Sequence, residues 1–494
     1  MPHRDPPFEP LASRSTMCLY RHGARAGRID PQLVNPLYKS ELLVTTIIPA
    51  PVFLERGSGT FRPTSVRGPL AGYAGETLGL TVSGDADVTL TLAGAPGEGY
   101  TLEISAEGIQ ATAGSAAGLF YAVQTLRQLE NNGEYPHVRI GDEPRFAYRG
   151  AMLDVARHFF GVADVKHYID DIAALKINHL HLHLTDDQGW RIEILSWPNL
   201  TAHGSTTSVN GDGGGFYTQA DYSEIVEYAA SRFITIVPEI DLPGHTNAAL
   251  ASYPELTPDG IPAELYEGIE VGFSTLTIGN ERTYEFVRDV LTEVADLTPG
   301  PFLHVGGDES LSTTAEDFLI FAKRLGEIGA ATGKTLIGWH ELGKSAELPA
   351  GTIGQYWGFT TPEGDSAAEA ATFVARGGQL IMSPADVAYL DMKYATSTPL
   401  GLVWAKGPTS IVDAATWEPT EIVPGIGEAQ ILGVEAPLWT ETLATIADLE
   451  IMAFPRLAAI AQIAWSQQGT AHDPAALETF GERLDAWGVN RFRG

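Results

Sequence analysis

From Pro144 onward, short apolar stretches alternate with longer amphipathic stretches, and this alternation constrains the fold more than any other feature of the sequence. Eight of the short stretches have the length and composition of buried strands: residues 151–155, 179–184, 234–239, 302–305, 335–339, 352–357, 379–383 and 431–435. Strands that alternate with helices form βα units and a parallel sheet, and eight such units close into a barrel. The sequence therefore predicts an α/β fold with a (β/α)8 TIM barrel.

Helices and loops between these strands are also visible in the sequence. Residues 164–176 and 315–329 carry apolar side chains at three- and four-residue spacing, which predicts amphipathic helices. Three longer stretches, 190–217, 252–273 and 390–427, interrupt the alternation and are rich in Gly, Pro or Thr. Because long loops at the carboxyl end of a barrel usually build its pocket, we expect these three to surround a substrate.

The residues before the barrel divide into two parts. Residues 46–145 contain short alternating patterns typical of strands, as at 87–92, and then a helical pattern that Ser115 is placed to cap. We predict a small α+β domain there, followed by a catalytic barrel over residues 146–494. Residues 1–45 carry scattered prolines and no hydrophobic period, which predicts an N-terminal extension with little structure of its own.

Charge and cysteine content exclude several classes of protein. The 494 residues include 31 Lys and Arg against 62 Asp and Glu, a net charge of −31 that repels nucleic acids and anionic membranes. We therefore expect a neutral or cationic substrate, with no nucleic acid or membrane partner. The single cysteine, Cys18, excludes an intrachain disulfide and a thiolate zinc cluster. The sequence as written contains neither a membrane-spanning run nor an export signal, so we expect a cytoplasmic protein, or a secreted one if the start is misassigned.

Chemically active side chains follow nearly every predicted strand, which is where a barrel enzyme has its active site. The first four strands are followed by acids, one histidine and one arginine: Asp154, Arg157, Asp186, Asp187, Glu239, Asp241, His245, Asp308 and Glu309. The last four strands are followed by aromatic residues and further acids: Trp339, Glu341, Trp357, Tyr389, Asp391, Trp439 and Glu441. Aromatic faces stack on the C–H surfaces of sugars, while carboxylates and arginine bind hydroxyl groups. This combination is typical of a carbohydrate-binding site.

The segment Gly306-Gly307-Asp308-Glu309 has two acids directly after two glycines. Adjacent side chains of a strand point to opposite faces, so these acids share a pocket only if the strand ends and the backbone turns at the glycines. Two close carboxyl groups usually divide their roles between a protonated acid of raised pKa and an ionised stabiliser. We therefore expect unequal roles for Asp308 and Glu309.

A second interpretation starts from the histidines of residues 179–184, which alternate along one face of a strand. His181 and His183, together with Asp186, have the donor atoms for a divalent metal, as in a metal-dependent barrel amidohydrolase. The companion metal ligands are not evident from the sequence, and buried histidines also serve as hydrogen-bonded core residues or orient nearby acids. We therefore expect no metal and no cofactor. A third hypothesis, a sugar-binding module without activity, is disfavoured by the intact pair of acids.

Four motifs occur in order along the barrel: MLDVARHF at 152–159, HLHLTDDQGW at 181–190, PEIDLPGH at 238–245 and HVGGDE at 304–309. In composition and order they resemble the motifs of family 20 glycoside hydrolases, which are β-N-acetylhexosaminidases such as the bacterial chitobiases. The resemblance runs from about Ile47 to the end of the chain, and the first 45 residues have no counterpart in the family.

The resemblance implies a retaining hydrolysis in which the substrate's own 2-acetamido oxygen attacks the anomeric carbon and forms an oxazolinium intermediate. Glu309 corresponds to the general acid and base, and Asp308 to the group that orients the acetamide. Tyr389 corresponds to a hydrogen-bond donor to the acetamide oxygen, and Asp186 with His245 to a pair that supports Glu309.

The resemblance also implies which residues bind the sugar. They are Trp339, Trp357 and Trp439 around the acetamide methyl group, Arg157, Asp391 and Glu441 at the hydroxyl groups, and Trp404 against the next sugar. The expected substrate is a chito-oligosaccharide or another glycan that ends in β-linked GlcNAc or GalNAc, cleaved by exo action as in chitin degradation.

Overall fold

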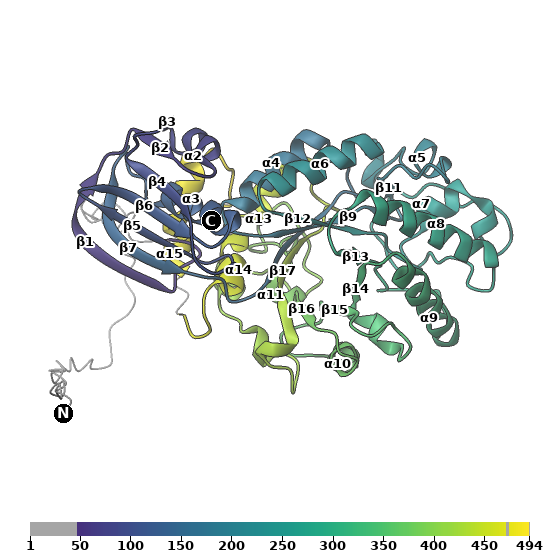
Figure 1. Ribbon diagram of the computed structural model, residues 1–494. Helices are drawn as coiled ribbons and strands as arrows, with labels where there is room; N and C mark the ends of the chain where they lie inside the picture. Colours follow the sequence, from purple (N-terminus) through teal and green to yellow (C-terminus); the bar gives the residue numbers. More distant parts are fainter. Residues whose placement is uncertain (1–46, 471–473, 494) are drawn as a thin grey trace, which may run out of the picture. The chain divides into compact units, whose positions relative to one another are not determined.

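The structure is a computed structural model that describes residues 47–470 and 474–493, and its larger part is a barrel (Figure 1). The barrel strands are β8 (Tyr148–Asp154), β9 (His179–His183), β12 (Thr235–Glu239), β13 (Phe302–His304), β14 (Thr335–Trp339), β15 (Ile353–Tyr356), β16 (Leu380–Met382) and β17 (Ile431–Leu438). Every neighbouring pair is parallel, and β17 pairs with β8 to close the barrel. The predicted TIM barrel is confirmed. The predicted extension over residues 1–45 lies outside the described residues.

Helices follow most of the barrel strands in the order that βα units require, whereas β14 is followed only by a 3-10 helix at His340–Lys344. The longer ones are α4 (Val162–Ala173), α6 (Gln219–Ser231), α8 (Glu281–Leu297), α9 (Ala315–Ala331), α10 (Ser366–Ala375), α13 (Ile446–Ala453), α14 (Arg456–Trp465) and α15 (Pro474–Ala486). Both helices expected from apolar spacing are present, as α4 and α9. Helix α4 begins earlier than predicted because the side chain of Asp164 accepts a hydrogen bond from the backbone N–H of Gly161 and fixes the helix start there. Within the described part of the chain, no helix combines the length and apolar character needed to cross a bilayer.

Short elements occupy the loops at the carboxyl ends of the strands. They are β10 (Thr185–Asp186), β11 (Gly189–Trp190), α5 (Asn199–Ala202), α7 (Asn247–Ser252), α11 (Ala385–Ala388) and α12 (Ile411–Ala415). The three long loops predicted from the sequence therefore leave the barrel on this side, after β9, β12 and β16.

The small domain consists of one mixed sheet and two helices. Its strands are β1 (Phe53–Phe61), β2 (Ser65–Arg67), β3 (Thr81–Val82), β4 (Val88–Leu92), β5 (Tyr100–Ser105), β6 (Gly108–Ala113) and β7 (Tyr135–Asp142), in the order β1-β7-β5-β6-β4-β2-β3. Its helices are α2 (Ala71–Leu78) and α3 (Ala116–Leu129). Ser115 caps α3 as predicted, because its side chain accepts a hydrogen bond from the backbone N–H of Gly118.

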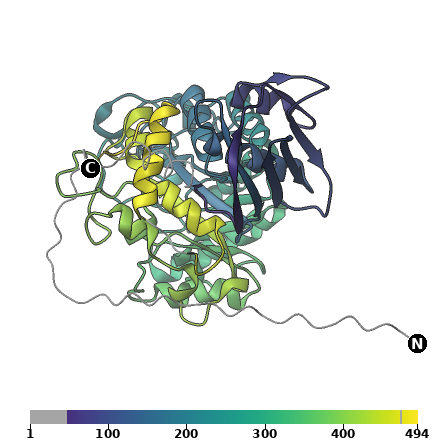
Figure 2. The same cartoon turned by 90° about the vertical axis from the view of Figure 1, so that its left-hand side faces the viewer.

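The small domain packs on the barrel through a buried polar network. Lys176, which follows α4, donates hydrogen bonds to Asp142 of β7 at 2.8 Å and to Tyr100 of β5 at 2.9 Å. The indole of Trp465 in α14 donates to the same carboxylate at 2.9 Å. Figures 1 and 2 show the sheet (purple to blue) beside the barrel, with the C-terminal helices (yellow) next to it. These contacts lie near the amino ends of β8 and β9, opposite the strand ends that carry the site.

Candidate active site

The carboxyl ends of the barrel strands surround a pocket of about 460 Å³. Most of the predicted site residues line it: Arg157, His245, Asp308, Glu309, Trp357, Tyr389, Trp404, Trp439 and Glu441. Three others, Asp186, Trp339 and Asp391, are buried and do not line the pocket. The barrel thus brings together side chains from segments after β8, β12, β13, β15, β16 and β17.

A turn after β13 lets both acids of the glycine motif reach the pocket. Gly306 and Gly307 have φ angles of 65° and 105°, and Glu309 has a φ angle of 41°. A Cβ atom on Gly306 would lie 1.7 Å from a carboxylate oxygen of Asp241, so only glycine fits there. A positive φ is strained for a glutamate, and such strain is concentrated at functional sites. This is the turn that the paired glycines predict.

His245 connects the acid pair with the buried Asp186. Its Nδ1 lies 3.1 Å from Oδ1 of Asp186, and its Nε2 lies 3.9 Å from Asp308 Oδ2 and 3.6 Å from Glu309 Oε2. Burial alone would lower the pKa of His245, but the charge of Asp186 raises this pKa well above its usual value. Burial would raise the pKa of Asp186, yet the Arg157 guanidinium at 2.8 Å and His245 hold it well below its usual range. An ionised Asp186 therefore orients a protonated His245 toward the two acids.

The two acids differ in exposure. Asp308 is 7% exposed, whereas the side chain of Glu309 is 32% exposed. Burial raises the pKa of Asp308 to about 6, although the charge of His245 opposes this shift. Within the described residues, Oδ1 of Asp308 has no hydrogen-bond partner. Asp308 is therefore an acceptor in the pocket that is largely ionised near neutral pH.

Glu239, the last residue of β12, anchors several groups behind the pocket. Its Oε2 lies 2.5 Å from Nδ1 of His183, and its Oε1 lies 2.9 Å from both His304 Nδ1 and Trp339 Nε1. His183 Nε2 in turn lies 2.8 Å from Asp186 Oδ2. Burial would raise the pKa of Glu239, but the surrounding histidines hold it well below its usual range. Glu239 thus connects the support of His245 with an indole of the aromatic wall described next.

An aromatic wall extends from the barrel interior to the pocket mouth. The ring centroids of Trp339 and Trp439 are 6.0 Å apart, and Tyr389 lies 6.2 Å from Trp439 and 5.6 Å from Trp404. Trp357 lies 6.1 Å from Trp404. Trp339 is fully buried, whereas Trp404 is 46% exposed. The wall therefore offers a closed apolar corner at depth and a stacking surface at the rim.

Polar groups near this wall have unused hydrogen-bonding capacity. Nε of Arg157, both carboxylate oxygens of Asp391 and Oε2 of Glu441 have no partner among residues 47–470 and 474–493. Burial, together with the charge of Glu441, raises the pKa of Asp391 well above its usual value. Burial also raises the pKa of Glu441, against the effect of Arg157. These groups are suited to binding several hydroxyl groups of a sugar.

The alternating histidines use both ring nitrogens inside the protein. His181 lies 2.9 Å from Glu435 Oε1 and 2.9 Å from Glu239 Oε2. His183 is held between Glu239 and Asp186. A metal ion would have to replace these contacts. The geometry therefore favours an orienting role for His181 and His183 over the metal site of the amidohydrolase interpretation.

Sequence reasoning did not single out the remaining lining residues, Ile269, Glu270, Val271, Leu402 and Val403. They lie on the loops 252–273 and 390–427, whose position at the pocket the sequence does predict. The pattern of these loops carries no information on which side chains face inward, because that depends on the loop conformation.

Family models match most of the described chain. Residues 65–143 match domain 2 of glycosyl hydrolase family 20, and residues 146–317 and 310–468 match the catalytic domain of the same family. The chain belongs to glycosyl hydrolase family 20. It is therefore a glycoside hydrolase, and this membership favours the glycosidase over the amidohydrolase.

Known family 20 proteins resemble the chain over most of its length. A beta-N-acetylhexosaminidase of Cellulomonas fimi is 46% identical over 377 residues, which cover 75% of this chain and 74% of the relative. The structure of Streptomyces plicatus N-acetyl-beta-hexosaminidase in complex with Thio-NAglucal has a TM-score of 0.88 and 46% identity, covering 92% of this chain and 97% of that one. An N,N'-diacetylchitobiase of Vibrio harveyi is 28% identical over 563 residues, covering 87% of this chain and 64% of the relative.

Proposed function

We propose that this family 20 hydrolase is an exo-acting, retaining β-N-acetylhexosaminidase that removes terminal non-reducing β-linked GlcNAc or GalNAc. The observation that carries the proposal is the convergence of Asp308 and Glu309 on His245, whose Nε2 lies 3.9 and 3.6 Å from their carboxylate oxygens, in a pocket walled by indole rings. The names of the Cellulomonas fimi and Streptomyces plicatus relatives carry the same activity.

Glu309 is the general acid and base. Its carboxyl group is the more exposed of the pair, so it can protonate the glycosidic oxygen as the bond to the anomeric carbon breaks. In the second step the same group removes a proton from the attacking water. His245, held by the ionised Asp186, orients Glu309 from behind.

Asp308 positions the internal nucleophile. Its unpartnered Oδ1 accepts a hydrogen bond from the acetamide N–H, and its negative charge stabilises the oxazolinium that forms when the acetamide oxygen bonds to the anomeric carbon. Water then attacks this carbon from the side that the leaving group vacated. The product keeps the β configuration, and no carboxylate of the enzyme bonds to the sugar.

The closed corner of the aromatic wall receives the acetamide methyl group. Trp357 and Trp439 line this corner, the buried Trp339 packs against Trp439, and the hydroxyl group of Tyr389 donates to the acetamide oxygen. A tight apolar corner of this kind holds the reacting oxygen close to the anomeric carbon, which supplies much of the rate enhancement. Arg157, Asp391 and Glu441 bind the hydroxyl groups of the same sugar.

Chito-oligosaccharides are the substrate class that we favour. Trp404 is 46% exposed at the pocket mouth and offers a stacking surface for the sugar next to the cleaved one. The likeness to a chitobiase supports this choice. A chito-oligosaccharide is uncharged, which suits a chain with a net charge of −31.

Inhibition by a thiazoline that mimics the cyclic intermediate tests the proposal. Wild-type enzyme should bind the thiazoline at least about 100-fold more tightly than GlcNAc, because a site complementary to a transition state binds its analogues best. Asp308→Asn should lose most of this preference, since the variant lacks the charge that faces the intermediate. Equal affinity of the wild type for the thiazoline and GlcNAc would contradict the proposal.

A further inference from the structure

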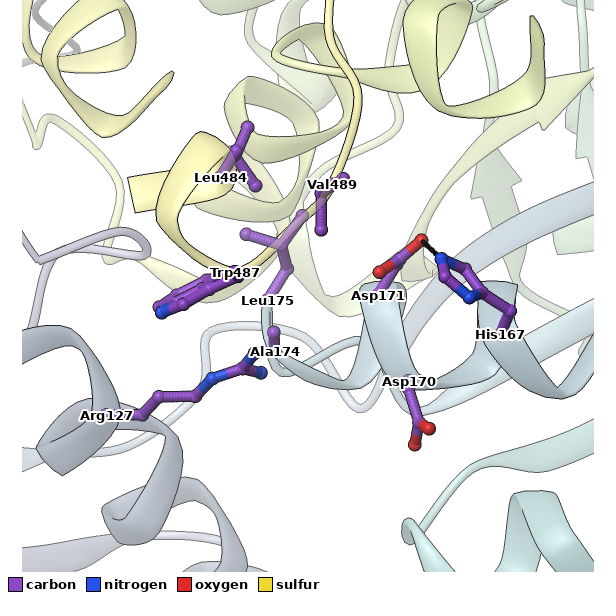
Figure 3. Close-up of a pocket in the computed structure, with 9 residues that line it drawn as sticks. All are labelled: Arg127, His167, Asp170, Asp171, Ala174, Leu175, Leu484, Trp487 and Val489. Carbon is purple, nitrogen blue, oxygen red and sulfur yellow. Dashed lines mark ion pairs between the residues drawn. The ribbon is translucent and has the colours of Figure 1, made fainter. Parts of the chain in front are cut away.

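A second group of polar side chains lies between α4 and α13, away from the active-site pocket. His167 and Asp171 are one turn apart on α4, and Glu450 faces them from α13. Nε2 of His167 lies 2.8 Å from Oε1 of Glu450 and 3.6 Å from Oδ2 of Asp171. Figure 3 shows the carboxylate of Asp171 turned toward the His167 ring, whereas Asp170 points away from it. Three donor atoms from two helices therefore converge on one point.

One carboxylate oxygen of Asp171 lacks a hydrogen-bond donor among the described residues. Its side chain is 8% exposed, and within the described residues its Oδ2 has no hydrogen-bond partner and only the ion pair with His167 at 3.6 Å. Burial raises the pKa of Asp171 to about 7, the charges of Glu450 and Asp170 add to this effect, and the charges of His167 and, less strongly, Arg127 offset only part of it. A buried carboxylate oxygen without a donor is costly, and such atoms call for an explanation such as an ion.

The neighbouring acid is already engaged. Oδ1 of Asp170 accepts a hydrogen bond from Arg232 at 2.8 Å, and its Oδ2 accepts one from Tyr228 at 2.6 Å. Oε2 of Glu450 accepts hydrogen bonds from the backbone N–H of Asn490, at 3.1 Å, and from the side-chain amide of the same residue, whereas Oε1 is directed to His167. The donors at the point of convergence are therefore one imidazole nitrogen and two carboxylate oxygens, and a bound ion would replace the 2.8 Å contact between His167 Nε2 and Glu450 Oε1.

The site is open to a small solute. A cavity of about 160 Å³ lies against it, lined on one side by His167 and Asp171 and on the other by Arg127 and Trp487 (Figure 3). The side chain of His167 is 51% exposed, so the imidazole also meets solvent. An ion can reach the three donors and keep a water molecule as a further ligand.

We propose that His167, Asp171 and Glu450 form a binding site for a divalent first-row transition metal, with Zn²⁺ as the best fit. In a tetrahedral zinc site the ligands lie about 2.0–2.2 Å from the metal and hence about 3.3 Å from one another. The distances of 2.8 and 3.6 Å around His167 bracket this value, so small side-chain movements complete the site. An imidazole donor disfavours Ca²⁺ and Mg²⁺, which prefer oxygen ligands.

The metal would act as a structural clamp. It ties α4 to α13, and through the contacts of Glu450 with Asn490 it also ties both helices to the C-terminal segment. Because the ion binds the folded chain, it raises thermal stability by RT ln(1 + c/Kd), where c is the concentration of free Zn²⁺, so the melting temperature increases with the concentration of free ion.

Titration of the full-length, chelator-treated protein with Co²⁺, followed by its visible absorption and by calorimetry, tests the site. We expect one ion per chain and a higher melting temperature with Zn²⁺. His167→Gln and Asp171→Asn should each weaken binding at least tenfold and remove the shift in melting temperature, while His203→Gln, a change at an exposed histidine, should alter neither.

A direct readout does not depend on the variants. An anomalous difference peak within about 2.2 Å of His167 Nε2, Asp171 Oδ2 and Glu450 Oε1 in zinc-soaked crystals would support the site. No binding by the wild type, or binding that persists in folded His167→Gln, as judged by a cooperative melting transition, would overturn the proposal.

Discussion

Asp308 and Glu309 are adjacent in the chain but have different surroundings. The buried Asp308 has a raised pKa and an oxygen without a hydrogen-bond partner among the described residues, whereas the side chain of Glu309 is more exposed. The difference comes from the turn at Gly306 and Gly307, which brings two successive side chains into one pocket at different depths. The raised pKa belongs to Asp308, the group that we assign as the ionised stabiliser, which differs from the division expected from the sequence, where a raised pKa marks the protonated acid.

The loss of activity in Glu309→Gln should depend on the leaving group of the substrate, because Glu309 is the group that protonates it. The variant cannot donate a proton, so hydrolysis of an alkyl or sugar leaving group should fall by about 100- to 10,000-fold. Glycosides with a good aryl leaving group need little protonation and should lose far less in the bond-breaking step. Rates for a series of aryl glycosides check this, with Glu316→Gln on the outside of α9 as control. Equal losses across the series would rule out the assignment.

Asp308→Asn should increase stability at the cost of activity. The folded-state pKa of about 6 lies above the value of about 3.9 in an unfolded chain, so the wild type loses stability as the pH rises between these values. Above pH 7 the loss reaches up to about 3 kcal/mol, and an uncharged Asn avoids it. The variant should therefore be more stable than the wild type at pH 8 and lose this advantage toward pH 4. Melting temperatures across this range, with Asp85→Asn as an exposed control, measure the effect; an advantage independent of pH would contradict it.

Most of the site side chains could be predicted at the residue scale because strand ends fix where they lie. Asp154, Glu239 and Trp339 each end a strand, so the strand pattern alone brings them to one end of the barrel. That Ile269 and Val403 line the pocket could not be predicted, because the orientation of their side chains depends on loops without periodicity. That His183 is held between two carboxylates also depends on neighbours far away in the sequence.

At the scale of elements, β12 holds its neighbours together through its last residue. Glu239 contacts His183 of β9, His304 of β13 and Trp339 of β14, so the carboxyl ends of four strands meet at one buried carboxylate. The same contacts orient Asp186 and the deepest indole of the aromatic wall. We therefore expect that a change of Glu239 displaces both Asp186, which supports the acid pair through His245, and Trp339, the deepest indole of the aromatic wall.

Glu239→Gln should lower kcat/KM by about 10- to 100-fold, because small shifts of the groups that it anchors misalign the reacting atoms. It should also change the pH profile. The charge of Glu239 raises the pKa of Asp308, so its removal should move the acid limb, near pH 6 in the wild type, to lower pH. Glu435→Gln on β17 is a matched control, since Glu435 is equally buried and also contacts His181. An unchanged acid limb in Glu239→Gln, or the same change in both variants, would contradict this account.

The sequence predicts the barrel strands better than the sheet of the small domain. Each barrel strand pairs with the next barrel strand in the chain, and β17 pairs with β8. The order of the strands around the barrel is therefore their order in the sequence. In the small domain β7 lies between β1 and β5, and β4 pairs with β6 in parallel. Such pairings arise from contacts between distant residues, and alternating patterns contain no information on which strands will meet.

At the scale of the whole molecule, the small domain and the barrel are joined by a buried ion pair between Asp142 and Lys176. Nζ of Lys176 lies 4.5 Å from the ring of Trp465, and Asp142 also accepts hydrogen bonds from Tyr100 and Trp465. Both charged side chains are fully buried. Burial lowers the pKa of Lys176, so the pair depends on mutual compensation of charge.

Lys176→Met should destabilise the protein by about 3–5 kcal/mol, because it leaves Asp142 as an uncompensated buried charge. Lys176→Met combined with Asp142→Asn should recover a large part of this loss, since no buried charge remains. Urea unfolding of the wild type, the single variant and the double variant measures both effects. A single variant within 1 kcal/mol of the wild type, or a double variant no better than the single one, would exclude this role for the pair.

The most direct test of the central claim compares two substrates that differ in one group. Release of p-nitrophenol is measured from the β-N-acetylglucosaminide and from the β-glucoside, which has a hydroxyl group in place of the acetamido group. Because the acetamide is the nucleophile, we predict that the acetamido substrate is cleaved at least about 1,000-fold faster. Comparable rates for the two substrates would mean that the enzyme supplies its own nucleophile, and would contradict the account.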